Sequence, residues 1–244
     1  MSSAAERLAT FLANSSLPWL TLTVLAYLGA VWLYRRSGNS PYLIPVLPAV
    51  IVVVAVLLLT GTPYPLYFGH VEALYFLIGP ATVALAVPLF GQLGRIRQMW
   101  RPLGVALVVG SSAAIVSAVL IAWALGGSLE TILSLAPKSA SMPFALPVAE
   151  RLGGLASLAA VAVAITGILG AVVARPLLNV MGIHDPAVRG FAVGLTAHAI
   201  GTARALQVNE TAGAFSALAM GLNGVATAVL VPLFIALLQL LGML

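Results

Sequence analysis

Long apolar runs separated by short polar stretches follow one another along almost the whole chain. A helix needs about 20 mostly apolar residues to cross the hydrocarbon core of a bilayer. Candidate segments lie at 17–34, 42–60, 72–93, 103–126, 129–149, 153–178, 187–206 and 213–241. This pattern predicts an all-α integral membrane protein, a polytopic bundle of about seven or eight membrane segments.

The composition supports the same class of protein. The 244 residues are 61% hydrophobic and 7% charged, whereas an ordinary soluble domain carries about 25% charged residues. Nothing outside the apolar runs is long enough to form a soluble core. We therefore expect residues 1–244 to form a single transmembrane domain, multi-pass in the inner or plasma membrane, with the lipid bilayer as its surroundings.

The charge and the residue types exclude several other functions. The net charge of +5 comes from basic residues scattered over short loops, which is typical of membrane orientation and not of a nucleic-acid-binding face. There is no cysteine, so thiolate metal sites and cysteine nucleophiles are absent. HExxH, GxSxG and P-loop motifs are absent too. We expect no metal, no cofactor and no enzymatic activity.

Two proline-containing segments match when the chain is shifted against itself by 57 residues. The stretch "GPATVALAVPL" at 79–89 then falls on "APKSASMPFAL" at 136–146, which aligns Pro80 with Pro137 and Thr82 with Ser139. The shift also aligns Gly110 with Gly167. This predicts an internal repeat with units of about 72–126 and 129–183, either parallel or inverted.

The prolines of these segments are candidates for broken-helix backbone. Proline lacks an N–H and clashes with the preceding turn, so Pro80, Pro88, Pro137 and Pro143 should kink or break their helices. Simple kinks satisfied by Ser and Thr side chains are the alternative. Matching broken helices in two repeats point to the binding site of a transporter, because freed backbone groups meet there.

Lys138 is the sharpest single residue in the sequence. A cation within the membrane is costly and therefore usually faces a cavity where it acts. With the hydroxyls of Ser139 and Ser141 and the start of a half-helix, its ammonium can bind a small carboxylate. The alternatives are a lysine that reaches the membrane interface or one paired with Glu130 or Glu150.

A second constellation lies in "GLTAHAIGTARAL", 194–206. His198 and Thr202 are four residues apart and share a helix face, and an imidazole can relay protons near neutral pH. Arg204 can bind a carboxylate with its guanidinium if the helix unwinds near Gly201, which is a further candidate for broken-helix backbone. The alternatives are a neutral His198 that bonds a neighbouring helix and an Arg204 that anchors at the interface.

Two further polar residues complete the candidate substrate-binding set. Thr82 occupies the position equivalent to Ser139 in the predicted repeat, and Asn223 lies within the last apolar run. An asparagine in such a run also commonly serves as a hydrogen-bonding contact between helices.

The chain resembles the LrgB/CidB family of membrane proteins. The resemblance covers roughly residues 17–241, and its matching stretches are "LIGPATVALAVPLF" (77–90), "LAPKSASMPFA" (135–145), "TGILGAVVARPLL" (166–178), "RGFAVGLTAHAIGTARAL" (189–206) and "GAFSALAMGLNGVATAVLVPL" (213–233). Residues 137–139 match the family's Pro-Lys-Ser motif, and residues 198–202 match its His-Ala-Ile-Gly-Thr motif.

The resemblance implies two kinds of function. Family members are described as holin-like or antiholin-like proteins that affect murein hydrolase activity and autolysis, usually with a small membrane partner of the LrgA/CidA type. Relatives are also linked to pyruvate uptake, and the plastidial glycolate/glycerate transporter carries a similar domain.

We expect the chain to transport small monocarboxylates such as pyruvate, glycolate or lactate. Lys138 and Arg204 would neutralise the anion, and His198 would couple protons. The alternative is a holin-like or antiholin-like regulator of murein hydrolase activity and autolysis. We expect a homo-oligomer in either case.

Overall fold

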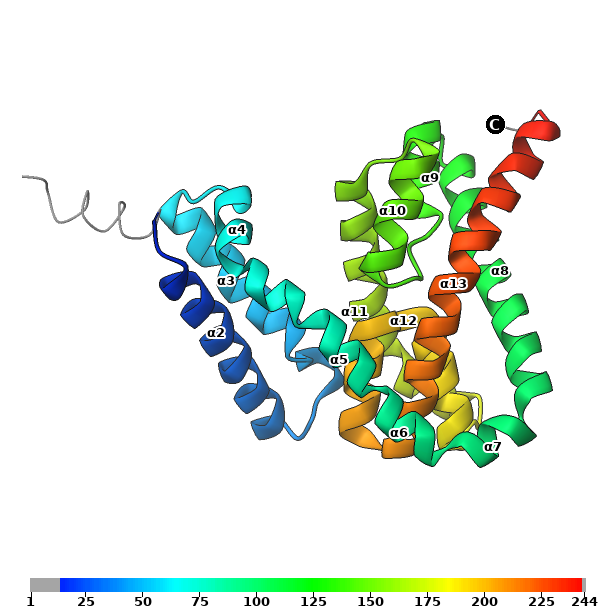
Figure 1. Ribbon diagram of the computed structural model, residues 1–244, viewed down its shortest axis with the longest axis horizontal. Coiled ribbons are helices and arrows are strands. Elements are labelled where there is room, and N and C mark those ends of the chain that lie inside the picture. Colours follow the sequence, from blue (N-terminus) through cyan, green and yellow to red (C-terminus); the bar gives the residue numbers. More distant parts are fainter. Residues whose placement is uncertain (1–13, 243–244) are drawn as a thin grey trace, which may run out of the picture. The chain divides into compact units, whose positions relative to one another are not determined.

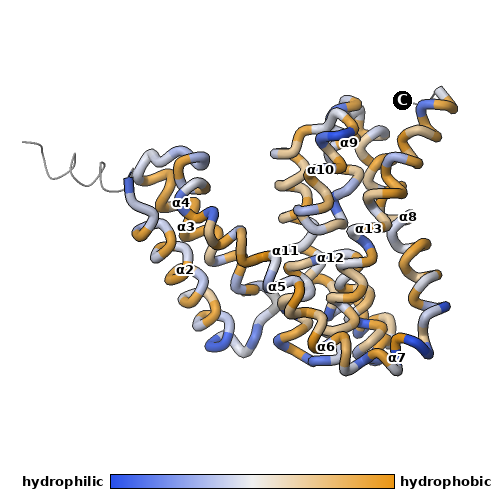
Figure 2. The backbone as a smooth tube through the Cα atoms, viewed as in Figure 1, coloured by the Kyte–Doolittle hydropathy of each residue, from blue (hydrophilic) through white to orange (hydrophobic). Residues whose placement is uncertain are grey.

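The computed structural model describes residues 14–242, and within this part of the chain it contains helices and no strand. Among these described residues, five helical stretches are long and apolar enough to cross a membrane: Ser16–Arg36, Tyr64–Gly91, Trp100–Ala124, Ala156–Val180 and Glu210–Leu240. The hydropathy-coloured backbone shows the apolar residues along the helices (Figure 2). The prediction of an all-α membrane protein is confirmed, while the count of seven or eight segments stays a prediction.

The described chain divides into two compact units, 14–86 and 87–242. The first unit holds α2 (Ser16–Arg36), the short 3-10 helix η1 (Pro41–Leu43), α3 (Val46–Thr60), α4 (Tyr64–Phe76) and α5 (Ile78–Ala84). Helix α2 packs against α3 and α4. Its core forms around Trp19, whose ring meets that of Tyr67 edge-on with centroids 5.8 Å apart.

The second unit begins within α6 (Ala86–Gly91). Its other helices are α7 (Leu93–Gln98), α8 (Trp100–Ala124), α9 (Leu129–Leu135), α10 (Met142–Leu152), α11 (Ala156–Val180), α12 (Pro186–Val208) and α13 (Glu210–Leu240). Helix α13, orange to red in Figure 1, packs against α8, α10 and α12, and α11 packs against α9, α10 and α12. The candidate residues 137–143 and 198–223 all lie in this unit.

The predicted segment 129–149 is broken in its middle. Helix α9 ends at Leu135 and α10 begins at Met142, with turns between them. Pro137 is fully buried in this break, and Pro143 lies in the first turn of α10, where proline is tolerated. Proline cannot supply the N–H that a continuing helix needs. We call residues 136–141 the first break.

The segment that the predicted repeat pairs with this one has a different local structure. Residues 72–93 form the end of α4, then α5 and α6, with interruptions at Leu77 and Leu85. Pro80 lies inside α5 and Pro88 inside α6. The repeat itself stays a prediction.

Helix α12 is interrupted at His198. Its backbone there has φ 39° and ψ −130°, so two helical stretches meet at this residue. The left-handed region of φ is unfavourable for residues other than glycine, typically by about 1–3 kcal/mol, and persists only where surrounding contacts impose it. We call His198 and its flanking turn the second break. The sequence predicts unwinding near Gly201, whereas the structure places the break at His198.

Glycines allow α12 and α13 to approach closely. A Cβ added at Gly190 would strike the backbone of Ala212, and one at Gly194 would strike the backbone of Ser216. Asn209 alone connects the two helices, and its side chain accepts the N–H of Ala212 as an N-cap. The close crossing brings polar residues of α13 against the second break.

Candidate functional site: two helix breaks joined through α13

Lys138 lies in the first break. Its side chain is half-buried, and its Nζ donates to Ser139 Oγ at 3.4 Å. Within residues 14–242 the one ion pair joins Arg95 and Asp185, so neither Glu130 nor Glu150 neutralises this ammonium. An ammonium has three N–H donors, and a single long hydrogen bond leaves it able to bind an anion.

Two buried serines and a helix start follow the lysine within the first break. Ser139 and Ser141 are 7% and 8% exposed. Ser141 is the N-cap residue of α10 in extended conformation, and its side chain makes no capping hydrogen bond. The positive end of the α10 dipole therefore lies at the break, next to the lysine in sequence. Ammonium, hydroxyls and helix start together form an environment suited to a small anion.

His198 approaches this site from α12. The imidazole is 3% exposed, and its Nε2 donates to the carbonyl of Val163 on α11 at 2.9 Å. A Cβ added at Gly167 would lie 2.5 Å from the ring carbon Cε1, so this glycine makes room for the histidine. Val163 belongs to the same buried cluster as Ala140, which lies in the first break. The two breaks, each with one ionisable side chain, therefore lie in one region of the second unit.

Asn223 on α13 connects the breaks. Its Nδ2 donates to the carbonyl of Ser139 at 2.8 Å and to the carbonyl of Leu195 at 3.1 Å. Its Oδ1 accepts from Ser111 Oγ on α8 at 2.7 Å. The sequence places Asn223 among the substrate-binding residues, and in the structure its amide bonds to the protein.

Thr202 and Ser216 form hydrogen bonds next to the second break. Thr202 Oγ1 donates to the carbonyl of His198 at 2.7 Å and bonds to Ser216 Oγ at 2.8 Å. Because the single Thr202 hydroxyl proton goes to His198, Ser216 is the donor in the second bond. Two residues further along α12, Arg204 Nη1 donates to the carbonyl of Ala171 on α11 at 2.7 Å. This guanidinium is bound to the neighbouring helix.

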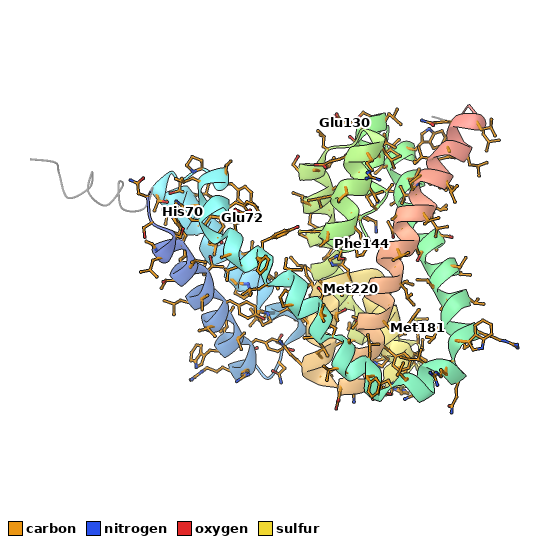
Figure 3. The ribbon with its side chains drawn as sticks, viewed as in Figure 1. His70, Glu72, Glu130, Phe144, Met181 and Met220 are labelled. Atoms are coloured by element: carbon orange, nitrogen blue, oxygen red, sulfur yellow. The ribbon has the colours of Figure 1, made fainter. Side chains whose placement is uncertain are left out.

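Phe144 packs the first break against α13. It lies at the start of α10 (Figure 3). A Cβ added at Gly224 on α13 would lie 2.5 Å from a carbon of its ring. Ala140, Ala145 and Val163 form a buried cluster beside it. The glycine next to Asn223 thus lets an aromatic side chain of α10 pack against α13.

Thr82 and Pro80 belong to the first unit. Thr82 is exposed there, and its Oγ1 donates to the carbonyl of Ile78 at 2.7 Å within α5. Pro88 lies in α6 at the start of the second unit. The expected meeting of the freed backbone groups of the two proline-containing segments stays a prediction.

Sequence reasoning missed Ser111, Val163 and Ser216. Ser111 and Ser216 are small residues among many in apolar helices, and Val163 contributes a backbone carbonyl, which leaves no trace in the sequence. One signal was present: the predicted repeat aligns Gly110 with Gly167, and both lie against α12, beside Leu195 and His198 respectively. Within residues 14–242 no group of three or more His, Cys, Asp or Glu side chains is placed to hold a metal.

This helical membrane protein belongs to the LrgB-like family, whose model matches residues 23–237. Among similar proteins, the uncharacterized protein YxaC of Bacillus subtilis is 36% identical over 216 residues, which cover 88% of this chain and 94% of YxaC. An uncharacterized protein of Haemophilus influenzae is 31% identical over 211 residues, 86% of this chain and 91% of that protein.

A third relative carries a functional name. The antiholin-like protein LrgB of Bacillus mycoides is 26% identical over 215 residues, 88% of this chain and 94% of that protein. No solved structure matches the chain. The resemblance predicted from the sequence is confirmed, and the relatives' names favour the antiholin-like alternative over the expected monocarboxylate transporter.

Proposed function

We propose that the protein is an antiholin-like regulator of murein hydrolase activity and autolysis, a multi-pass protein of the cell membrane without enzymatic activity. The observation that carries this proposal is the alignment with an antiholin-like protein over 88% of this chain and 94% of that relative. So extensive an alignment means that the relative has no additional domain to which its described role could belong. We propose a small LrgA/CidA-type partner and a homo-oligomer as the assembly.

The test is expression in a bacterial strain that lacks its own LrgB-like proteins. Autolysis rate and the murein hydrolase activity released by the cells are measured with the protein present and absent. We expect both to change when the protein is in the membrane. Unchanged autolysis and hydrolase activity, with immunoblots showing the protein in the membrane fraction and the small partner co-expressed, would contradict the proposal.

Transport of a small monocarboxylate such as pyruvate, lactate or glycolate is a second candidate, favoured by the environment of Lys138. A half-buried ammonium without a carboxylate partner among residues 14–242 is costly, and an anion from solution would neutralise it. A carboxylate provides two oxygens that can accept from Lys138 Nζ and from the hydroxyls of Ser139 and Ser141. A lesion-forming assembly has no need of such a group.

Proton coupling in this carrier would use His198. Its Nε2 proton is engaged with Val163, so the added proton would bind at Nδ1. An imidazolium beside Lys138 would strengthen the attraction for a carboxylate, which links proton entry to anion entry. We propose Thr202 and Asn223 as groups that shape the breaks, and Thr82 and Arg204 as contacts made in another state of the carrier.

Purified protein in liposomes separates the two functions. Radiolabelled pyruvate uptake is measured alongside release of a trapped dye. Saturable uptake without dye release supports the carrier, whereas dye release in step with protein content supports formation of a lesion. Both functions are compatible in one protein, since a changed carboxylate flux would alter autolysis indirectly.

A further inference from the structure

We propose that Asn223 is a positioning residue that clamps the two helix breaks together and so fixes the spacing of Lys138 and His198. The amide is 1% exposed. The Nδ2 group donates to the carbonyl of Ser139 in the first break and to the carbonyl of Leu195 beside the second. Ser111 Oγ orients the amide by donating to Oδ1.

The carbonyls that Asn223 binds are those that the breaks release. A helical hydrogen bond from the N–H of residue i+4 to the carbonyl of residue i spans the dihedral angles of the residues between them. The angles of His198 therefore disrupt the bonds that Leu195, Thr196 and Ala197 would accept in a continuous helix. Ser139 lies between α9 and α10, where no helix continues. A buried carbonyl needs another donor in such a place.

No other described side chain makes hydrogen bonds to both breaks. Thr202 binds the carbonyl of His198 and serves the second break alone. Ser139 Oγ meets Lys138 inside the first break. The single amide on α13 is thus the polar link between segments that lie 56 residues apart in sequence, 139 to 195. Loss of this link should loosen both breaks together.

If the protein transports carboxylates as proposed above, the clamp should also affect how tightly the site at Lys138 binds an anion. If Lys138 and His198 act on one ligand, their spacing must be held while the ligand is bound. Asn223 holds the backbone next to each of them, at Ser139 and at Leu195. It would affect anion affinity without touching the anion.

Hydrogen–deuterium exchange tests the clamp without any assay of function. Full-length protein in detergent micelles is compared as wild type, Asn223→Ala, Asn223→Leu and Thr227→Ala. Asn223→Leu keeps the branched arrangement of heavy atoms and removes the hydrogen bonds. Thr227 is the control, because it is also buried on α13, at 2% exposure, and contacts neither break through a hydrogen bond.

We expect amide exchange to rise about tenfold or more in peptides covering both 136–141 and 195–199 for each Asn223 variant, because buried carbonyls lose their donor. Thr227→Ala should leave both peptides within about twofold of wild type, since it removes no bond to a break. Exchange that rises in only one peptide, in neither, or equally in Thr227→Ala would overturn the clamp.

Pyruvate uptake by the same proteins in liposomes reports on function separately. If exchange rises in the Asn223 variants but the wild type takes up no pyruvate, the clamp is supported and the proposed carboxylate transport is contradicted. If the wild type takes up pyruvate but exchange is unchanged in the Asn223 variants, carboxylate transport is supported and the clamp is contradicted. If both hold, Asn223→Leu should raise the KM for pyruvate while Thr227→Ala leaves it unchanged.

Discussion

The strained backbone of His198 predicts an inversion of the usual ranking of alanine and glycine. In a helix interior, Ala is more stable than Gly by about 1 kcal/mol. His198 has φ 39° and ψ −130°, where a Cβ costs about 1–3 kcal/mol and glycine pays nothing comparable. Both His198→Ala and His198→Gly remove the imidazole and its bond to Val163, so that loss cancels in the comparison.

Thr196 supplies the matched control, since it lies in the helical stretch of α12 before the break and is exposed. At Thr196, the Gly variant should be less stable than the Ala variant by about 1 kcal/mol. At His198, the Gly variant should equal or exceed the Ala variant, so that the two Gly-minus-Ala differences are separated by about 1–3 kcal/mol.

The assay is SDS-induced unfolding in mixed micelles, followed by far-UV circular dichroism of all four variants. The free energy of unfolding is compared within each Ala/Gly pair. A Gly variant that is less stable than Ala by the same amount at both positions would refute the strained conformation at His198, and with it the second break.

Two further predictions concern the supports of α12. Gly194→Ala should destabilise the protein by about 1–3 kcal/mol, because its Cβ would strike the backbone of Ser216. Gly221→Ala on α13 is the control, since its Cβ meets open space and the change should be neutral or stabilising. Thermal unfolding in detergent ranks the two variants, and equal effects would contradict the close crossing of α12 and α13. Asp185 caps α12, and its carboxylate pairs with the guanidinium of Arg95 at 2.6 Å. Burial acts to raise the pKa of this carboxyl. The N–H groups of Val188 and Ala187 and the Arg95 guanidinium lower it by more, so the pKa lies below 3.8. Its ionised form therefore stabilises the fold above pH 3.8 and loses this effect as the pH falls through the lowered pKa. Asp185→Asn keeps a capping oxygen but removes the charge. The wild type should therefore be more stable than this variant at neutral pH, and the difference in stability should disappear in acid. A difference in stability that does not depend on pH would contradict the role of the ionised carboxylate.

The class of fold and the first break could be predicted because their causes are local. Apolar runs of membrane-spanning length identify a helical membrane protein whatever the arrangement of its helices. Pro137 and the polar residues after it cannot continue a helix, so the break between Leu135 and Met142 follows from the residues themselves. The prolines at 80 and 88, with the same chemistry, lie inside helices, which shows that proline alone does not decide the outcome.

The second break could not be located because its causes are distant in sequence. His198 carries no helix-breaking chemistry, and the expected unwinding at Gly201 followed glycine's local preference. The strained angles are held by contacts from other helices, among them the carbonyl of Val163 and the space left by Gly167. The partners of Asn223 lie 84, 28 and 112 residues away. No pattern within one helix indicates such contacts.

The most direct test of the anion site at the first break is uptake of radiolabelled pyruvate, competed by glycolate and lactate, into liposomes containing wild type, Lys138→Ala or Arg151→Ala. Arg151 is an exposed cation in the last turn of α10, so its loss removes the same charge outside the break. Uptake is measured with and without an inward proton gradient, and circular dichroism verifies that each variant is folded. We predict saturable uptake by wild type and Arg151→Ala that is lost in folded Lys138→Ala. Equal uptake by all three proteins, or no uptake by wild type with the small membrane partner supplied, would contradict a carboxylate site at Lys138.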